Sequence, residues 1–226
     1  MRQSYIVTAF LVLVFIVASC APQSVPPTGQ VIKNPDAVVY VDTDNNGVLT
    51  EGVDRRMVVS ADEFGNYEIR VTNAREGIIV PASTKIRAKE EAAGIYITTT
   101  GGGITIGDAA TLQAPDNVLL ATPGNIKVGL KAKLVSKTST IDIDSGGDIM
   151  IGDGAMLRAT YIFIANFFGR GPIVGNKIKI QTEDLQIMAS SNVLITNSII
   201  KLGTNGYASI DVLEPGEGYA IDLSGT

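Results

Sequence analysis

The feature that most constrains this chain is a short motif that recurs in phase. The pattern Ile-x-(Ile/Val)-Gly, with a Leu five residues after the Gly, begins at Ile104, Ile126 and Ile149. The copies are spaced by 22 and then 23 residues. A fixed period of this length is typical of repeat proteins, in which each repeat stacks on its neighbours. The motif therefore predicts a stack of similar units.

Short β-rich runs lie around and between these copies, with β-branched residues alternating with other types. Gly, Asn, Asp, Ser and Thr separate the runs as turn residues, and no stretch beyond the first 20 residues has a helical period. The runs are Ile95–Ile97, Val118–Leu120, Ile141–Ile143, Ile162–Ile164, Ile178–Ile180, Leu185–Ile187, Val193–Ile195, Ile199–Leu202 and Ile210–Val212. This spacing predicts an all-β fold: a short parallel β-helix of about 22 residues per coil over 77–226, including a carboxy-terminal cap. Coils about 4.8 Å apart would give roughly six coils and ~30 Å of solenoid between Gly77 and Val212.

Two local features refine this prediction. Gly107, Gly129 and Gly152 recur at the same place in the motif, and we expect them at corners that need unusual backbone dihedrals. The stretch from Phe167 to Gly175 breaks the rhythm and predicts a loop inserted from one coil. The competing fold is an antiparallel β-sandwich or barrel, which also has strands every 8–12 residues or so. The in-phase recurrence favours the solenoid.

Two passages carry a family resemblance. GGGITIGDAATLQA (101–114) and GGDIMIGDGAMLRA (146–159) resemble the repeats of filamentous-haemagglutinin-type adhesins, and the resemblance extends over about 95–202. Bactofilin-like polymers have similar sequences. The first resemblance implies a right-handed β-helix and an adhesive role, and the second implies a subunit that stacks end to end.

The amino terminus has the pattern of a targeting signal. Arg2 precedes an apolar run, Tyr5–Ala18, that has the length of a signal-peptide core and is short for a membrane span of about 20 residues. The sequence Val-Ala-Ser-Cys ending at Cys20 resembles the lipobox of bacterial lipoproteins, which implies cleavage after residue 19 and lipid on the Cys20 thiol. Cys20 is the only cysteine, so it has no disulfide partner within the chain. An ordinary signal peptide or an uncleaved anchor is the alternative.

The segment 20–35 is predicted to be a lipidated tether. Its run APQSVPPTG (21–29) is rich in Pro and small polar residues, which keep a chain extended and bury little surface. In lipoproteins, Ala rather than Asp after the cysteine implies the outer membrane, so we expect a lipid-anchored protein of the outer membrane or cell surface. Loss of Arg2 would change the net charge from −5 to −6, which argues against nucleic-acid binding.

Residues 36–76 are predicted to form a small β module that caps the solenoid, because an open β-helix end exposes unpaired strand groups. Expected strands at Val38–Val41 and Met57–Ser60 flank a D-x-D-x-N-G loop, and Glu68–Val71 is a third strand. Oxygen ligands at positions 1, 3 and 5 of such a loop converge on a hard cation, and Gly at position 6 makes the bend. The candidate calcium ligands are Asp42, Asp44, Asn46, Val48, Glu51 and Asp54.

The loop departs from an EF-hand because Val53 occupies position 12 and strands flank it. With the later turn Asp62–Tyr67, it resembles the start and end of the calcium-binding bacterial surface B-type repeat. That resemblance implies Ca²⁺, with weak affinity of about 10⁻⁴–10⁻³ M as in extracellular modules. The alternative is an Asp/Asn-Gly hairpin turn that needs no metal.

Candidate catalytic residues are few. The chain has no His, which removes the commonest general base and the commonest zinc ligand. Asp142 and Asp144 should share one face of a strand, with Asp148 and Asp153 following. Carboxylate pairs serve glycosidases, but Asp is also common around a Ser-Gly-Gly turn such as the one here. We therefore predict that the chain is not an enzyme, and that Arg158 and Arg170 are isolated.

An aromatic loop is the best candidate for a partner surface. Phe167, Phe168 and Arg170 lie in it, close to Phe163, and exposed aromatic groups mark interaction sites. Alternatively, Phe163 is core and the other two pack under the loop. The predicted function is a lipid-anchored structural or adhesin-like protein that presents a β-solenoid to an envelope protein, to a polysaccharide or to copies of itself. The alternative is a polysaccharide lyase or glycosidase that uses the acidic cluster.

Overall fold

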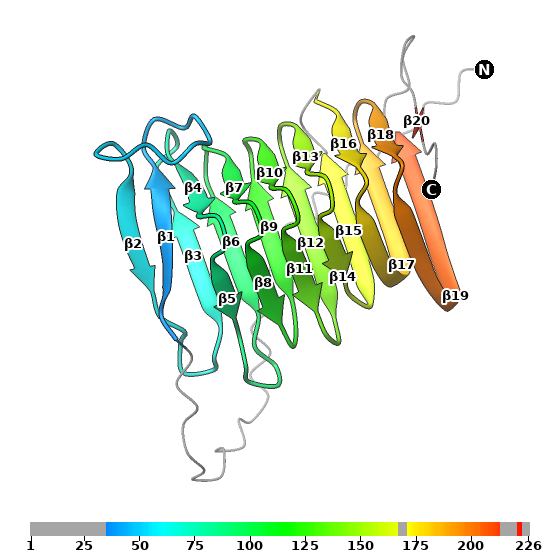
Figure 1. Cartoon of the computed structure of the whole chain (residues 1–226), viewed down its shortest axis with the longest axis horizontal. Coiled ribbons are helices and arrows are strands. Elements are labelled where there is room, and N and C mark those ends of the chain that lie inside the picture. The colour runs from blue at the N-terminus through cyan, green and yellow to red at the C-terminus, as the bar shows by residue number, and fades with distance from the viewer. Residues whose placement is uncertain (1–34, 167–170, 213–220, 223–226) are drawn as a thin grey trace, which may run out of the picture. The chain divides into compact units, whose positions relative to one another are not determined.

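The protein is a β-solenoid of about six turns, with about 23 residues per turn (Figure 1). The structure is a computed structural model and describes residues 35–166, 171–212 and 221–222. Within these ranges every regular element is a strand. Every strand pair from β3 onward is parallel, so the predicted parallel β-helix is confirmed and the antiparallel sandwich is excluded.

Each coil lays strands on three sides of the solenoid. The first side consists of β4 (Gly77–Val80), β7 (Ile104–Ile106), β10 (Ile126–Val128), β13 (Ile149–Ile151), β16 (Ile173–Asn176), β18 (Val193–Thr196) and β20 (Ile221–Asp222). The second side consists of β5 (Lys85–Arg87), β8 (Thr111–Ala114), β11 (Lys133–Ser136) and β14 (Met156–Arg158). The third consists of β3 (Tyr67–Val71), β6 (Ile95–Thr99), β9 (Val118–Thr122), β12 (Thr140–Ser145) and β15 (Tyr161–Asn166). The longer strands β17 (Lys179–Ala189) and β19 (Ile199–Val212) each supply both the second and third sides.

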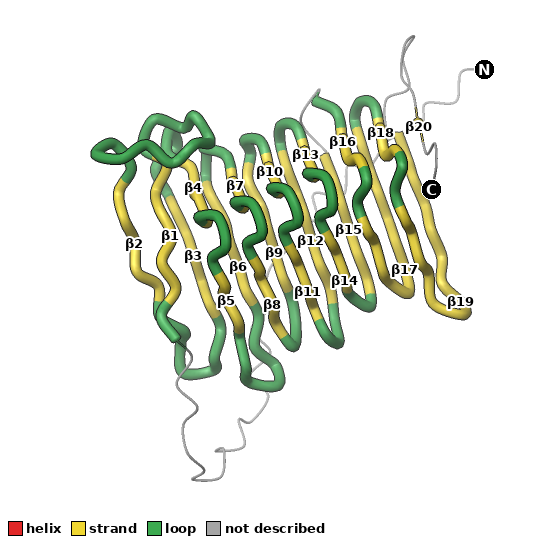
Figure 2. The backbone as a smooth tube through the Cα atoms, in the orientation of Figure 1, coloured by secondary structure: helices red, strands yellow, loops and turns green. Residues whose placement is uncertain are grey.

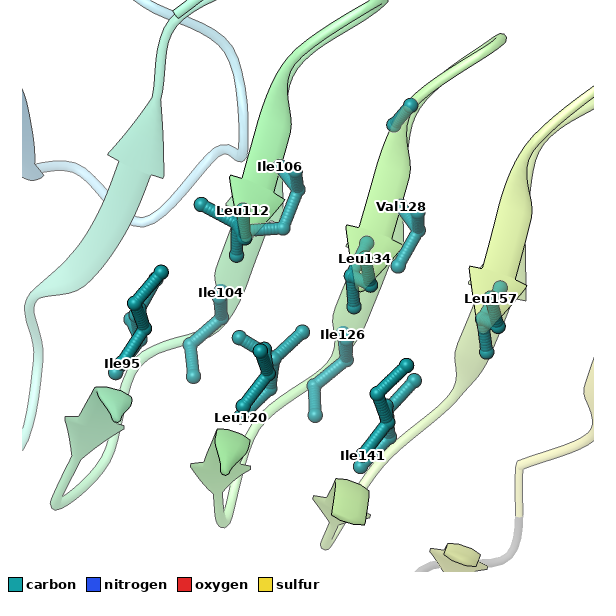
Figure 3. Close-up of a cluster of buried hydrophobic side chains, with 14 of the residues drawn as sticks. Ile95, Ile104, Ile106, Leu112, Leu120, Ile126, Val128, Leu134, Ile141 and Leu157 are labelled. Atoms are coloured by element: carbon teal, nitrogen blue, oxygen red, sulfur yellow. The ribbon is translucent and has the colours of Figure 1, made fainter. Parts of the chain in front are cut away.

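The repeated aliphatic residues stack in register inside the solenoid (Figure 3). Ile126 pairs with Ile104 on one side and with Ile149 on the other, and Leu134 lies between Leu112 and Leu157 in the same way. All six are at most 1 % exposed. Full burial of such a side chain contributes about 1.5–3 kcal/mol, so the motif that sets the period also supplies the core.

The corner glycines have a different role from the one expected. Gly107, Gly129 and Gly152 do not have positive φ, so the prediction of unusual dihedrals is wrong. The preceding coil passes too close for a side chain instead: a Cβ on Gly107 would lie 2.4 Å from the Ala82 nitrogen. The left-handed conformation falls two residues later in each copy, at Ala109, Lys131 and Gly154, and also at Ser83, Lys177 and Asn197.

A ladder of buried polar side chains holds the corner between the third and first sides. Thr99, Thr122, Ser145 and Asn166 occupy matching inward positions. The hydroxyls of Thr99 and Thr122 lie 2.6 Å apart, and Ser145 Oγ donates to the Gly124 carbonyl at 2.7 Å. The glycine-rich turns predicted between strands therefore obtain partners from inside the solenoid.

The prediction of a loop over 167–175 is wrong for residues 173–175. Ile173–Asn176 forms β16, in which Ile173 pairs with Ile149 and is fully buried. The apolar Ile173 side chain fills the same inward position as Ile149, so core packing overrides the glycines and proline around it. The predicted runs 178–180 and 185–187 are also joined, because β17 crosses the corner with only a bulge between Thr182 and Asp184.

The amino-terminal cap is a hairpin that continues the sheet of the first side (Figure 2). Strand β1 (Ala37–Asp42) pairs antiparallel with β2 (Arg55–Val59) and with β4. Strand β3, inside the segment predicted as the cap, is already the first rung of the third side because it pairs parallel with β6. The cap and the solenoid belong to one compact unit.

Candidate functional site

The loop between β1 and β2 gathers three carboxylates. Asp42, Asp44 and Asp54 each place an oxygen within 4.8 Å of the others. Asp42 is buried, Asp44 is exposed and Asp54 is half-buried. The structure thus brings together three of the predicted calcium ligands, whereas the Glu51 carboxylate does not belong to this group.

Backbone amides of the loop bond to all three carboxylates, although the bond to Asp44, from the Asn46 nitrogen, is long at 3.4 Å. The oxygens of Asp42 accept hydrogen bonds from the Asn46 nitrogen at 3.1 Å and the Gly47 nitrogen at 2.8 Å. Those of Asp54 accept from the nitrogens of Thr43, at 3.0 Å, and Thr50, at 2.6 Å. Such charge-assisted bonds are the stronger kind, so these two side chains fix the course of the loop.

The remaining polar groups bond within the loop and to the solenoid. The Asn46 side-chain amide donates to Asp44 at 2.8 Å, and its oxygen accepts from the Val48 nitrogen at 2.6 Å. The Asn45 side-chain oxygen accepts from the Gly103 nitrogen, at 2.8 Å, next to β7. The acidic loop therefore joins the cap to the second coil of the solenoid.

The three carboxylates have the spacing that a calcium site needs. Calcium–oxygen distances of about 2.3–2.6 Å place ligands on opposite sides of the ion up to roughly 5 Å apart. Burial, followed by the neighbouring Asp44 and Asp54, raises the pKa of Asp42 above its ordinary value despite the two backbone bonds. A cation would favour the ionised form, so the residues fit the ion. They also fit a hairpin turn held by its own amides.

A second acidic group lies on the outer face of the third side. Asp142 and Asp144 both point outward from β12, as their spacing predicts. Asp142 lies in register between Leu119 and Phe163, and its Oδ1 is buried without a hydrogen-bond partner. Burial, with a smaller contribution from Asp144, raises the pKa of Asp142 to about 6.

The other members of the predicted acidic cluster lie elsewhere. Asp148 is in the turn before β13, where its backbone nitrogen donates to the Asn125 side chain at 2.8 Å. Asp153 pairs with Lys177 at 3.5 Å. The described residues contain one further ion pair, Arg55–Glu76, so no basic side chain pairs with Asp142 or Asp144 there.

Of the predicted partner surface, the structure describes only the neighbouring residue Phe163. Phe167, Phe168 and Arg170 lie outside the described residues, as do Cys20 and the tether. Phe163 points outward from β15 and is half-buried, because Ile162 and Ile164 on either side fill the core. The alternative that Phe163 is a core residue is therefore wrong.

Sequence reasoning missed a groove at the corner between the second and third sides. It has a volume of about 510 Å³ and is lined by residues from four consecutive coils, among them Lys137, Arg158 and Lys201. The prediction that Arg158 is isolated is wrong, because coil stacking brings distant basic residues to one surface. The only signal in the sequence is the uneven number of residues between successive strands.

No family model, curated protein or solved structure matches this chain. Among the described residues no helix is long and apolar enough to span a membrane.

Proposed function

We propose that this chain is a lipid-anchored protein of the cell envelope with a structural or adhesin-like role, and that it associates through the carboxy-terminal end of its solenoid. The lipobox-like sequence at Cys20 supports the anchor, and the Pro-rich tether would hold the solenoid away from the bilayer. The outer membrane or the cell surface is the proposed location.

Strand β19 is the observation that carries this proposal. It spans 14 residues and pairs with β17 on one edge, while no described strand pairs with its other edge. Ile199 and Tyr207 on this strand are 48 % and 66 % exposed. An open strand edge beside apolar side chains is a template for adding another strand. At the opposite end, the β1–β2 hairpin extends the first side, and the edges there that no described strand pairs with, on β2, β3 and β5, are only three to five residues long.

Sedimentation of the mature chain carrying Cys20→Ser tests the role of β19. We expect concentration-dependent association that Ile199→Lys and Tyr207→Lys abolish, because a charge on that surface opposes packing. Val58→Lys is the matched control, since Val58 is 49 % exposed on β2 at the capped end. A chain that stays monomeric at every concentration, or a control variant that dissociates equally, would contradict the proposal.

Metabolic labelling with palmitate tests the anchor separately. The wild-type chain should incorporate the label and fractionate with membranes, while Cys20→Ser should lose the label and be released or mislocalised. Unchanged labelling of the Cys20→Ser chain would refute the lipid anchor.

We also propose that the acidic loop binds Ca²⁺ weakly and so stiffens the joint between cap and solenoid. The three carboxylates within 4.8 Å of one another support this. Calorimetric titration with calcium to about 10 mM should release or absorb heat with the wild-type chain, given an affinity of about 10⁻⁴–10⁻³ M. Asp42→Ala with Asp44→Ala should abolish the heat, and Glu90→Ala with Glu91→Ala should leave it. Absence of heat with the wild type rejects the site.

A carbohydrate-active enzyme is the alternative. It would require Asp142, Asp144 and Asp148 to converge with a basic residue, whereas Asp148 lies in a turn and Asp142 has apolar neighbours on both strands. The geometry therefore supports a binding scaffold better. Release of reducing ends from acidic polysaccharides, lost in Asp142→Asn, would reverse this preference.

A further inference from the structure

The outward side chains of the second side form a basic face. Its strands are β5, β8, β11, β14 and the first parts of β17 and β19, and they contain no Asp or Glu. Every cation on them is exposed, and none forms an ion pair with another residue that the structure describes. These cations are Lys85, Arg87, Lys133, Arg158, Lys179 and Lys201. An unpaired basic surface on a chain of net charge −5 points to an anionic ligand.

The cations are spaced along the solenoid. Lys133 and Lys179 have Met156 in register between them, and Arg158 and Lys201 have Gln181 between them. Neighbouring coils therefore never place two of these charges directly opposite each other, which avoids the repulsion of adjacent like charges. In the row of Lys85, Lys133 and Lys179, a positive charge stands at every second coil, roughly 10 Å apart. In the other row, Arg87 and Arg158 are three coils apart, and Arg158 and Lys201 are two coils apart.

Corner lengths make one edge of this face concave. The segments joining the second to the third side are 136–139, 159–160, 182–183 and 202–206 in successive coils. Two short corners thus lie between two longer ones, and the groove of about 510 Å³ lies there. Lys137, Arg158 and Lys201 line it together with one acidic residue, Glu183, and with the polar side chains of Thr160 and Gln181.

We propose that the basic face and its groove bind a stretch of acidic polysaccharide. Such a polymer offers negative charges at repeated intervals for the cations, and hydroxyl groups for the neutral rungs between them. Thr160 and Gln181 are among the residues of the groove that can form hydrogen bonds to these hydroxyl groups. Arg158 can receive a carboxylate or sulfate group through two parallel hydrogen bonds.

The same observations disfavour other anionic partners. Single-stranded nucleic acid is held by aromatic side chains on which bases stack, and the second-side strands contain no Phe or Tyr. A bilayer surface is flat and cannot enter a groove between raised corners. The basic face ends on β19, the strand whose free edge is proposed to associate, so polymer binding is measured in a variant that does not associate.

Binding of defined polymers to the mature chain with Cys20→Ser tests the inference. Immobilised polygalacturonate and dextran sulfate should bind saturably, more weakly as salt rises, and neutral dextran should not bind. The triple variant Lys137→Ala, Arg158→Ala, Lys201→Ala should bind at least about tenfold more weakly, which is the effect of losing a few charge-assisted contacts. Preference for polygalacturonate assigns uronic acids, and preference for dextran sulfate assigns sulfated sugars.

A control variant distinguishes a specific binding site from general electrostatic attraction between the protein and the polymer. Arg56→Ala, Arg70→Ala and Lys127→Ala remove the same charge from exposed positions off the basic face. An equal loss in this control would overturn the inference, and so would a wild-type chain that ignores both acidic polymers. Tighter binding of a single-stranded oligonucleotide would also overturn it. Circular dichroism of both variants verifies that the solenoid is intact. All binding measurements are made on chains that also carry Tyr207→Lys, so that self-association does not affect the measured affinity.

Discussion

The second and third sides of the solenoid share one interior but differ outside. The second side exposes cations on strands that contain no acidic residue. The outer face of the third side carries Glu68, Asp142, Asp144, Asp184 and Asp211 against a single cation, Arg70. The core does not constrain which polar residues occupy the outward positions. Basic residues lie on one side of the corner and acidic residues on the other.

The charged side chains of the two faces differ in length as well as in the sign of their charge. Lys and Arg lay an apolar stem on the sheet and hold the charge in water. The short Asp142 side chain cannot do so between Leu119 and Phe163, and its Oδ1 has no partner. The second side therefore offers its charges to a ligand, whereas Asp142 on the third side bears a desolvation cost.

Adjacent inward and outward residues should respond very differently to the same substitution. Leu134→Asp should lower the free energy of unfolding by more than about 4 kcal/mol, because it removes a buried Leu and buries a carboxylate. Lys133→Asp, on the exposed surface of the same strand, should change it by less than about 0.5 kcal/mol. Urea unfolding followed by circular dichroism measures both. Similar losses in the two variants would mean that the outer face is also part of the packing.

The inward pattern could be predicted from the sequence because it repeats. Ile104, Ile126 and Ile149 obey a fixed period, and a strand alternates strictly between inside and outside. Stacking coils requires the same apolar residue type at each level, so the core, the period and the parallel sheet follow from one motif. Ile173 escaped prediction because flanking glycines and a proline hid a core position within an apparent loop.

The outer surface could not be predicted in the same way. Arg158 and Lys201 are 43 positions apart in the sequence, and only the corner lengths bring them into one groove. Those lengths depend on where each strand ends, and strand ends are the least certain part of a sequence-based prediction. The carboxylates of the acidic loop were easier to predict, because Asp42 and Asp44 lie in one short motif and come together without the stacking of coils.

Asp142→Asn should stabilise the protein at neutral pH. Burial raises the pKa of Asp142 from 3.8 to about 6, so between these values the folded chain holds a proton that the unfolded chain has lost. Stability therefore falls as the pH rises through this window. The variant should gain on the order of 1–2 kcal/mol near neutral pH, less than the full shift implies because the carboxyl is partly solvated, and almost nothing at the acid end of the window.

Unfolding of wild type and variant across this pH range tests the effect. The gain should appear as the pH rises from 3.8 to about 6 and stay constant above that. Asp148→Asn, in the turn before β13, is the control and should leave the pH profile of the wild type unchanged. A stability difference for Asp142→Asn that is the same at every pH would show that the carboxyl group is not the cause.

The smallest effect is expected from neutralising one charge of the basic face. Lys133 and Lys179 stand two coils, roughly 10 Å, apart, and two such charges repel by about 0.4 kcal/mol in water without salt. The screening length is about 8 Å at physiological ionic strength and about 30 Å at 0.01 M. Lys179→Gln should therefore raise the unfolding free energy by a few tenths of a kcal/mol at low salt and leave it unchanged at physiological salt.

Thermal unfolding of Lys179→Gln at the two ionic strengths measures this difference, with Lys127→Gln on the first side as the control. A stabilisation that persists at high salt would come from packing and not from charge. A destabilisation at low salt would mean that Lys179 has an attractive partner, and the second side would then not be a free basic face. The expected salt-dependent gain would instead show that the alternation of charged and neutral rungs keeps the repulsion small enough for these cations to remain unpaired.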